Sequence, residues 1–209
     1  MGKRRAALVI VLLVLFCVIA ASPNMWTIRA SGIIYIKADG TVEGTYNIQR
    51  DRNTYTFTDD INGAIVVEKD DIVVEGAGYT LNGGEILILG FAIYNRSNVI
   101  VRNVKVVGFT HGINLCGSTY CTITENTVTE SSVAGIQVAE FSKYNNGVRN
   151  IVTENSFNGL SIIYGSSENL FRGNIMQDNK YNMNVKGAHL FSSDVQFYVN
   201  DVDTSNLVD

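Results

Sequence analysis

The chain has 209 residues, a formal net charge of −4 and only two histidines. Its length suits one or two domains. The acidic balance argues against nucleic acid and anionic membrane surfaces as partners, and two histidines form no metal-ligand cluster.

The first predicted element is an N-terminal targeting segment at residues 1–22. Three basic residues at positions 3–5 precede an unbroken apolar run at positions 6–21. This order is typical of a secretory signal peptide. The run is short for a spanning helix of about 20 residues, and an uncleaved membrane anchor stays as the alternative. Both interpretations export the rest of the chain, so we expect a secreted, periplasmic or cell-surface protein.

Residues 23–60 form the second segment, which we interpret as an N-terminal cap. The segment matches none of the later repeats, although Thr54 to Thr58 alternates like a strand. A stacked β-structure needs a cap at its open end because unpaired strand edges promote aggregation.

Residues 61–209 consist of short apolar runs that glycine and asparagine interrupt. The runs are rich in β-branched residues, which predicts strands. Asn126, Asn155 and Asn174 each follow an apolar residue by three positions and precede another by two. Their separations of 29 and 19 residues average about 24, and each copy holds about three strands. This period predicts a parallel β-helix of roughly six coils, stacked about 4.8 Å apart.

Two stretches, Asp71 to Gly83 and Asn98 to Val104, resemble coils of right-handed parallel β-helix proteins. These proteins include the pectate-lyase-like superfamily and the NosD-like periplasmic proteins. The resemblance covers about residues 61–200 and implies an all-β, right-handed solenoid. It implies little about function, because the shared motifs are stacking motifs. Relatives usually carry more coils, so we expect a C-terminal truncation or a polar end at residues 201–209.

The repeated asparagines predict a structural feature inside the coils. Asparagine tolerates left-handed backbone geometry, and its amide can bond to an asparagine one coil away. We therefore expect Asn126, Asn155 and Asn174 to form a ladder inside one corner. Glu125 and Glu154 would then lie one coil apart on the outside of that corner, either as a ligand-binding pair or as solvated turn residues.

Four tyrosines, Tyr94, Tyr120, Tyr144 and Tyr164, lie close to the predicted ends of coils. A tyrosine ring beside polar amides and acids suits a carbohydrate, because the ring is apolar and its hydroxyl is polar. The alternative is that these rings only pack the corners. Combined with export, the tyrosines predict a non-catalytic module that binds a polysaccharide or another glycan.

Two other functions stay open. One is a polysaccharide lyase or glycoside hydrolase, although no catalytic set of acids and a base can be identified in the sequence. The other is a structural or metal-cofactor assembly role, which the NosD-like resemblance implies. The metal ligands for such a role would be His111, His189, Met176 and Met183, which are scattered along the chain. We expect no cofactor, and turn chemistry explains the acidic doublets that could bind calcium.

Three further residues invite modification or crosslinking. Asn95 opens the sequence Asn-Arg-Ser, which is an acceptor for N-glycosylation in an exported protein of a suitable host. Cys116 and Cys121 lie five positions apart, so export permits a disulfide between them if the turn brings them together. Two free thiols are the alternative.

Overall fold

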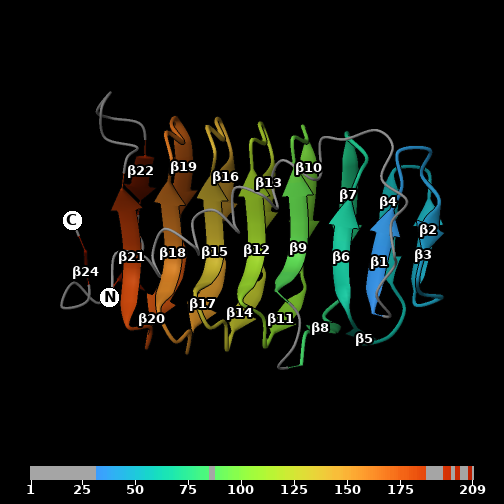
Figure 1. The fold of residues 1–209 in the computed structure, drawn as a ribbon, viewed down its shortest axis with the longest axis horizontal. Coiled ribbons are helices and arrows are strands. Elements are labelled where there is room, and N and C mark those ends of the chain that lie inside the picture. The colour runs from blue at the N-terminus through green and yellow to red at the C-terminus, as the bar shows by residue number, and fades with distance from the viewer. Residues whose placement is uncertain (1–31, 85–87, 187–194, 199–200, 203–206, 209) are drawn as a thin grey trace, which may run out of the picture. The chain divides into compact units, whose positions relative to one another are not determined.

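The computed structural model describes residues 32–84, 88–186, 195–198, 201–202 and 207–208. The regular elements in these residues are strands, which confirms the predicted all-β class. They form sheets of nine, eight and seven strands that run along a common stack (Figure 1). None of the described residues forms a helix that could cross a membrane. The predicted signal peptide or anchor at residues 1–22 lies outside the described residues.

The first sheet has the strand order β2-β1-β6-β9-β12-β15-β18-β21-β24. Its strands are β1 (Ile33–Ile36), β2 (Val42–Glu43), β6 (Ala64–Val67), β9 (Leu89–Tyr94), β12 (His111–Cys116), β15 (Ala134–Ala139), β18 (Asn158–Ile163), β21 (Tyr181–Lys186) and β24 (Leu207–Val208).

The second sheet has the order β22-β19-β16-β13-β10-β7-β4-β3. Its strands are β3 (Ile48–Asp51), β4 (Thr54–Phe57), β7 (Ile72–Glu75), β10 (Val99–Arg102), β13 (Thr122–Thr124), β16 (Asn146–Val148), β19 (Asn169–Arg172) and β22 (Val195–Tyr198).

The third sheet has the order β23-β20-β17-β14-β11-β8-β5. Its strands are β5 (Ile61–Asn62), β8 (Thr80–Asn82), β11 (Lys105–Val107), β14 (Thr127–Thr129), β17 (Ile151–Thr153), β20 (Ile175–Gln177) and β23 (Asp201–Val202).

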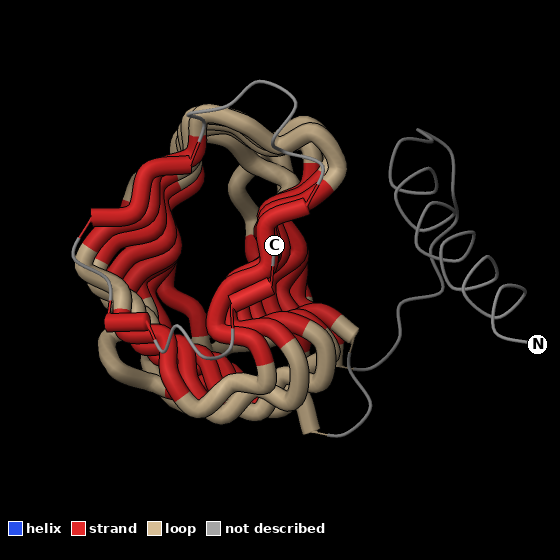
Figure 2. Tube along the Cα trace, turned by 90° about the vertical axis from the view of Figure 1, so that its left-hand side faces the viewer, coloured by secondary structure: helices blue, strands red, loops and turns tan. Residues whose placement is uncertain are grey.

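Each coil passes through the first, second and third sheets in turn. Seen along the stack, strands of successive coils lie behind one another and the loops gather between the sheets (Figure 2). The strands from β6 to β20 make five complete coils, and β21 begins a further one. This arrangement confirms the predicted parallel β-solenoid. The right-handed sense of the winding stays a prediction.

The interior of the solenoid is filled by residues that repeat from coil to coil. In the first sheet, Ile113, Ile136 and Leu160 are register partners and all are buried. In the second sheet, Gly147 is the partner of Phe171. A Cβ atom on Gly147 would lie 2.2 Å from the Phe171 ring, so the glycine makes room for this large buried side chain.

Residues 23–60, expected to form a cap, contribute strands to the stacked sheets. Strand β1 pairs in parallel with β6, and β4 pairs in parallel with β7. The parallel stack therefore begins before residue 61. Strands β2 and β3 pair antiparallel with β1 and β4 at this end, and a capping role for them stays a prediction.

Candidate functional site

The described coils turn at three corners, which we name by the sheets they join. The first corner joins the first sheet to the second, and the second corner joins the second sheet to the third. The third corner returns the chain to the first sheet. The first corner consists of residues 68–71, 95–98, 117–121, 140–145 and 164–168.

A residue with positive φ stands at the same place in successive turns of each corner, beginning with Asp71 at the first, Asn103 at the second and Gly108 at the third. Such left-handed geometry is cheap for glycine and tolerated by asparagine and aspartate. Strand register aligns these residues into one column for each corner. The columns are Asp71, Asn98, Tyr120, Tyr144 and Glu168 at the first corner; Asn103, Glu125, Arg149 and Gly173 at the second; and Gly108, Glu130, Glu154 and Asp178 at the third.

A buried asparagine follows the positive-φ residue in the later coils of all three corners. Asn150 illustrates the bonding at the second corner. Its Oδ1 accepts from the backbone N–H of Asn126 at 3.1 Å, and its Nδ2 donates to the carbonyl of Ile123 at 2.8 Å. The backbone N–H of Asn150 in turn donates to Oδ1 of Asn174 at 2.9 Å. Each amide therefore satisfies backbone groups of the preceding coil, which would be costly to leave unpaired.

The prediction that Asn126, Asn155 and Asn174 form one ladder is wrong, because they do not all lie at the same corner. Asn126 and Asn174 share the second corner, but Asn150 lies between them. Asn155 belongs to the third corner, where its Nδ2 donates to Oδ1 of Asn179 at 2.8 Å. The repeat from rung to rung is 24 residues. The separation of 29 residues is one repeat of 24 plus the five residues from the second corner to the third, and the separation of 19 is one repeat less those five residues.

The predicted pairing of Glu125 with Glu154 fails for the same reason. Glu125 follows β13 at the second corner, and Glu154 follows β17 at the third. The partner of Glu125 is Arg149 one coil later, whose Nε donates to the Glu125 carboxylate at 3.0 Å. The two glutamates are therefore separate exposed turn residues.

The four predicted tyrosines all lie at the first corner or at its edge. Tyr94 ends β9, Tyr120 and Tyr144 belong to the positive-φ column, and Tyr164 follows β18. The hydroxyl of Tyr94 accepts a hydrogen bond from Asn114 Nδ2 at 3.2 Å. The structure thus brings together side chains that lie up to 70 residues apart in the chain.

Phe141 is a fifth aromatic residue at this corner, which the sequence interpretation did not include. Its side chain is 69 % exposed, the highest value for any phenylalanine among the described residues. The ring leans over Gly165 in the next coil, at 2.6 Å from where a Cβ atom would stand. Phe141 lies where the turn lengthens. Thr119 lies three residues after Cys116. Their register partners in the next coil, Ala139 and Lys143, lie four residues apart, so this turn is one residue longer.

The described aromatic residues with positive φ all lie at the first corner. They are Tyr120, Phe141, Tyr144 and Tyr164, with φ from 54° to 59°; we call them the aromatic set. A bulky side chain is strained in this region by about 1–2 kcal/mol. All four side chains are exposed, so burial in the core does not offset the strain. Such strain points to a functional role for the side chains.

The positive-φ column of the first corner, which we call the outer ladder, holds two sets of side-chain contacts. Asn98 Nδ2 donates to Asp71 Oδ1 at 2.9 Å. The rings of Tyr120 and Tyr144 stack with centroids 5.1 Å apart and planes at 12°. The Tyr144 hydroxyl donates to the carboxylate of Glu168, and this bond raises the pKa of Tyr144. The stacked faces cover each other in part, so these two tyrosines offer mainly ring edges and hydroxyls to a ligand.

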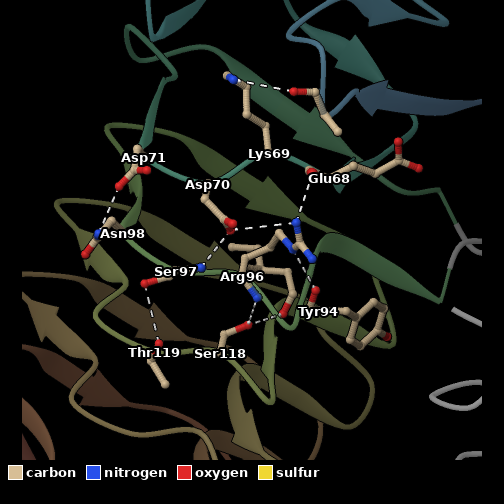
Figure 3. A network of polar contacts seen from close by, with 12 residues as sticks. Glu68, Lys69, Asp70, Asp71, Tyr94, Arg96, Ser97, Asn98, Ser118 and Thr119 are labelled. Carbon is tan, nitrogen blue, oxygen red and sulfur yellow. Dashed lines mark hydrogen bonds and ion pairs between the residues drawn. The ribbon is translucent and has the colours of Figure 1, made fainter. Parts of the chain in front are cut away.

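Arg96 links three coils, because its side chain binds the coils of β6 and β9 and its backbone N–H donates to Ser118 Oγ in the coil of β12 at 3.1 Å (Figure 3). Its Nε donates to the carbonyl of Tyr94 at 3.0 Å, and its Nη1 donates to the carbonyl of Glu68 at 3.0 Å. The same Nη1 lies 3.7 Å from Oδ1 of Asp70, which also accepts from the backbone N–H of Ser97. Asp70 and Asp71 therefore bind protein groups, as expected for turn residues.

Cys116 and Cys121 are not joined by a disulfide, so the alternative of two thiols holds. Cys116 ends β12, whereas Cys121 is the last residue of the first corner, in the ladder position that Asn145 fills one coil later. Cys121 Sγ contacts the carbonyls of Thr119 and Arg96. Burial raises the pKa of Cys121 to about 11, which makes the thiol unreactive at neutral pH.

Asn95 lies exposed at the first corner with φ of 51°. Its glycosylation stays a prediction. His111 begins β12, and burial lowers its pKa from 6.5 to about 4. His189 lies outside the described residues.

Residues 18–208 match the family model described as "Periplasmic copper-binding protein (NosD)". No curated protein matches the chain.

Proposed function

The chain belongs to the NosD family, and from this premise we propose that it is an exported, non-catalytic protein that binds a glycan at its first corner. The family's description as periplasmic supports the export. The parallel β-helix supports binding to an extended polymer, because successive coils repeat the same surface about every 4.8 Å.

The observation that carries the proposal is the strained, exposed aromatic set. Tyr120, Phe141, Tyr144 and Tyr164 occupy positions that glycine or asparagine fills elsewhere at lower cost. Aromatic rings bury large apolar areas against a ligand, and tyrosine adds a hydroxyl that bonds to sugar hydroxyls. Phe141 offers the most exposed ring, while Tyr120 and Tyr144 offer edges and hydroxyls.

Copper binding, which the family description names, does not fit the described residues. No group of three histidine, cysteine or acidic side chains that could hold a metal occurs among them. His111 and Cys116 stand at opposite ends of β12, roughly 16 Å apart at about 3.3 Å per residue. Met176 is fully buried inside β20. We therefore assign no step to copper in this part of the chain.

The proposal is tested by binding of the mature domain to a panel of soluble oligosaccharides, followed by calorimetry on the best ligand. Phe141→Gly and Tyr144→Gly remove rings from the aromatic set while relieving positive-φ strain. We expect each variant to weaken binding about tenfold, as is typical when an aromatic contact residue is lost, and to keep the parent melting temperature within a few degrees.

Tyr46→Gly is the matched control. Tyr46 is the most exposed tyrosine of the described residues and lies between β2 and β3, outside the first corner. Its loss should leave affinity unchanged. Absence of binding to every oligosaccharide, or equal weakening by Tyr46→Gly, would contradict the proposed function.

A further inference from the structure

We infer that the glycan held at the first corner is cationic, a polymer carrying amino sugars rather than neutral or acidic ones. The inference rests on the proposed function and adds the charge class of the ligand to it. It follows from the side chains that surround the aromatic set.

Carboxylates outnumber cations around the aromatic set. The outer ladder ends in a carboxylate on both sides, Asp71 before the tyrosines and Glu168 after them. Glu140 directly precedes Phe141 and also has positive φ. Arg96 faces Asp70 and donates to backbone carbonyls, so that pair adds little net charge.

Two cations of the corner remain: Lys69, whose Nζ donates to the carbonyl of Ala38 at 3.4 Å, and Lys143. Among the described residues, no carboxylate lies within ion-pair distance of the Lys143 ammonium group. Glu68 is paired with Lys37, and Asp70 with Arg96. The corner therefore sets three carboxylates, those of Asp71, Glu140 and Glu168, against these two ammonium groups, and only Lys143 lies in the coils that carry the aromatic set. A uronic acid polymer would meet repulsion from this set, whereas an ammonium group would be attracted.

Aromatic rings and carboxylates together form the chemistry that recognises an ammonium group. The face of a tyrosine or phenylalanine attracts a cation within about 6 Å of the ring centroid. A neighbouring carboxylate adds a charge-assisted hydrogen bond. Phe141, whose ring is the most exposed of the set, stands beside Glu140 and places both groups at the first corner, and Glu168 adds a second carboxylate there.

The charge of the whole chain acts in the same direction. The net charge is −4, although the three basic residues at positions 3–5 are included in it. An acidic protein attracts a cationic polymer over a distance comparable to the Debye length, about 10 Å at 0.1 M salt.

The test compares glucosamine oligomers with N-acetylglucosamine oligomers of the same length and with oligogalacturonate. The first two ligands share a backbone and differ in the charge of the amino group. Calorimetry should give an affinity for the glucosamine oligomer at least about tenfold above that for either other ligand, a factor expected for charge-assisted contacts. Raising the salt from about 20 to 200 mM should reduce this advantage.

Two variants test which carboxylates attract the glucosamine oligomer. Glu140→Gln and Glu168→Gln should each weaken binding of the glucosamine oligomer about two- to fivefold, because exposed ion pairs contribute little individually. Glu130→Gln at the third corner is the control, since Glu130 also has positive φ but no aromatic neighbour in its column. It should leave the affinity unchanged.

The outcomes separate this inference from the proposed function. If the N-acetylated oligomer or oligogalacturonate binds as tightly as the glucosamine oligomer, the ligand is not selected by positive charge and the inference fails, while glycan binding stands. If no oligosaccharide binds at all, the proposed function and the inference both fail.

Discussion

The first and second corners share their internal structure and differ in what they expose. Behind each corner, a buried asparagine accepts from the backbone of the coil before it: Asn145 at the first corner and Asn150 at the second. Outside, the second corner carries Glu125, Arg149 and Gly173, whereas the first carries stacked tyrosines. The backbone needs a residue that tolerates positive φ at both places.

This difference separates stability from function. The second corner shows that glycine, acidic and basic residues all satisfy the turn, so the turn itself does not require an aromatic side chain. We therefore propose that the side chains of the aromatic set serve contacts outside the protein. We expect the following effects on stability, from the largest to the smallest.

The largest loss of stability is expected when one of the buried ladder asparagines is replaced. Asn150→Leu leaves the backbone N–H of Asn126 and the carbonyl of Ile123 without their partners. We expect the free energy of unfolding to fall by about 3 kcal/mol or more, because each buried unpaired group costs about 1–3 kcal/mol. Asn145→Leu at the first corner should cost a similar amount in denaturant unfolding. Very different costs would show that the two ladders are not equivalent.

We expect acid to destabilise the domain through His111 in strand β12, not through a residue at a corner. The pKa of His111 is lowered from 6.5 to about 4 by burial, so the unfolded chain binds more protons between these values. Stability is therefore full above pH 6.5 and falls as the pH drops towards 4, by about 2 kcal/mol at pH 5. Thermal unfolding of the parent and of His111→Leu at pH 7 and pH 5 measures this. An identical loss in both proteins would contradict the assignment.

Exchanging the residue types of Cys121 and Asn126, the first residues of the ladders at the first and second corners, should have a smaller effect on stability. Cys121 holds at the first corner the position that Asn126 holds at the second. Asn126→Cys removes the donation from Asn126 Nδ2 to the Val101 carbonyl at 3.0 Å and the acceptor of the Val104 N–H at 3.1 Å. It should cost about 2 kcal/mol, less than Asn150→Leu, because a thiol still supplies a weak donor and acceptor. Cys121→Asn should change stability by less than about 1 kcal/mol, because the new amide can bond as Asn126 does. A large loss from Cys121→Asn would show that the first corner has a different interior.

The smallest effect on stability should follow substitutions in the positive-φ columns. Tyr144→Gly and Arg149→Gly both relieve strain and both increase the entropy of the unfolded chain, so each should change stability by less than about 1 kcal/mol. Only Tyr144→Gly should weaken glycan binding. A strong loss of melting temperature in Tyr144→Gly alone would show that the tyrosine stabilises the corner.

The fold could be predicted from the sequence because the stacking residues repeat along the chain. Short β-branched runs and an average asparagine spacing of about 24 residues indicate three strands per coil. The assignment of individual asparagines to corners could not be predicted. The segments around Asn126 and Asn155 look alike, but one follows β13 and the other follows β17, and only the register of the coils distinguishes them.

The candidate site was predictable in part. The four tyrosines were identified because they lie near the ends of coils, where loops expose side chains. Phe141 was missed because an apolar residue in a β-rich sequence is normally read as core. The signal that could have revealed it is the lengthened turn between Ala139 and Lys143, which places Phe141 outside the alternation of the strands.

The most direct test of the central claim is a nuclear magnetic resonance titration of the mature domain with the oligosaccharide that binds best. The account predicts shifts of the backbone amides at residues 117–121 and 140–145 and of the Phe141 and Tyr144 rings. The amides of Glu130 and Glu154 at the third corner should not move. Shifts confined to the third corner, or to the strands away from the first corner, would contradict the claim that the aromatic set binds the glycan.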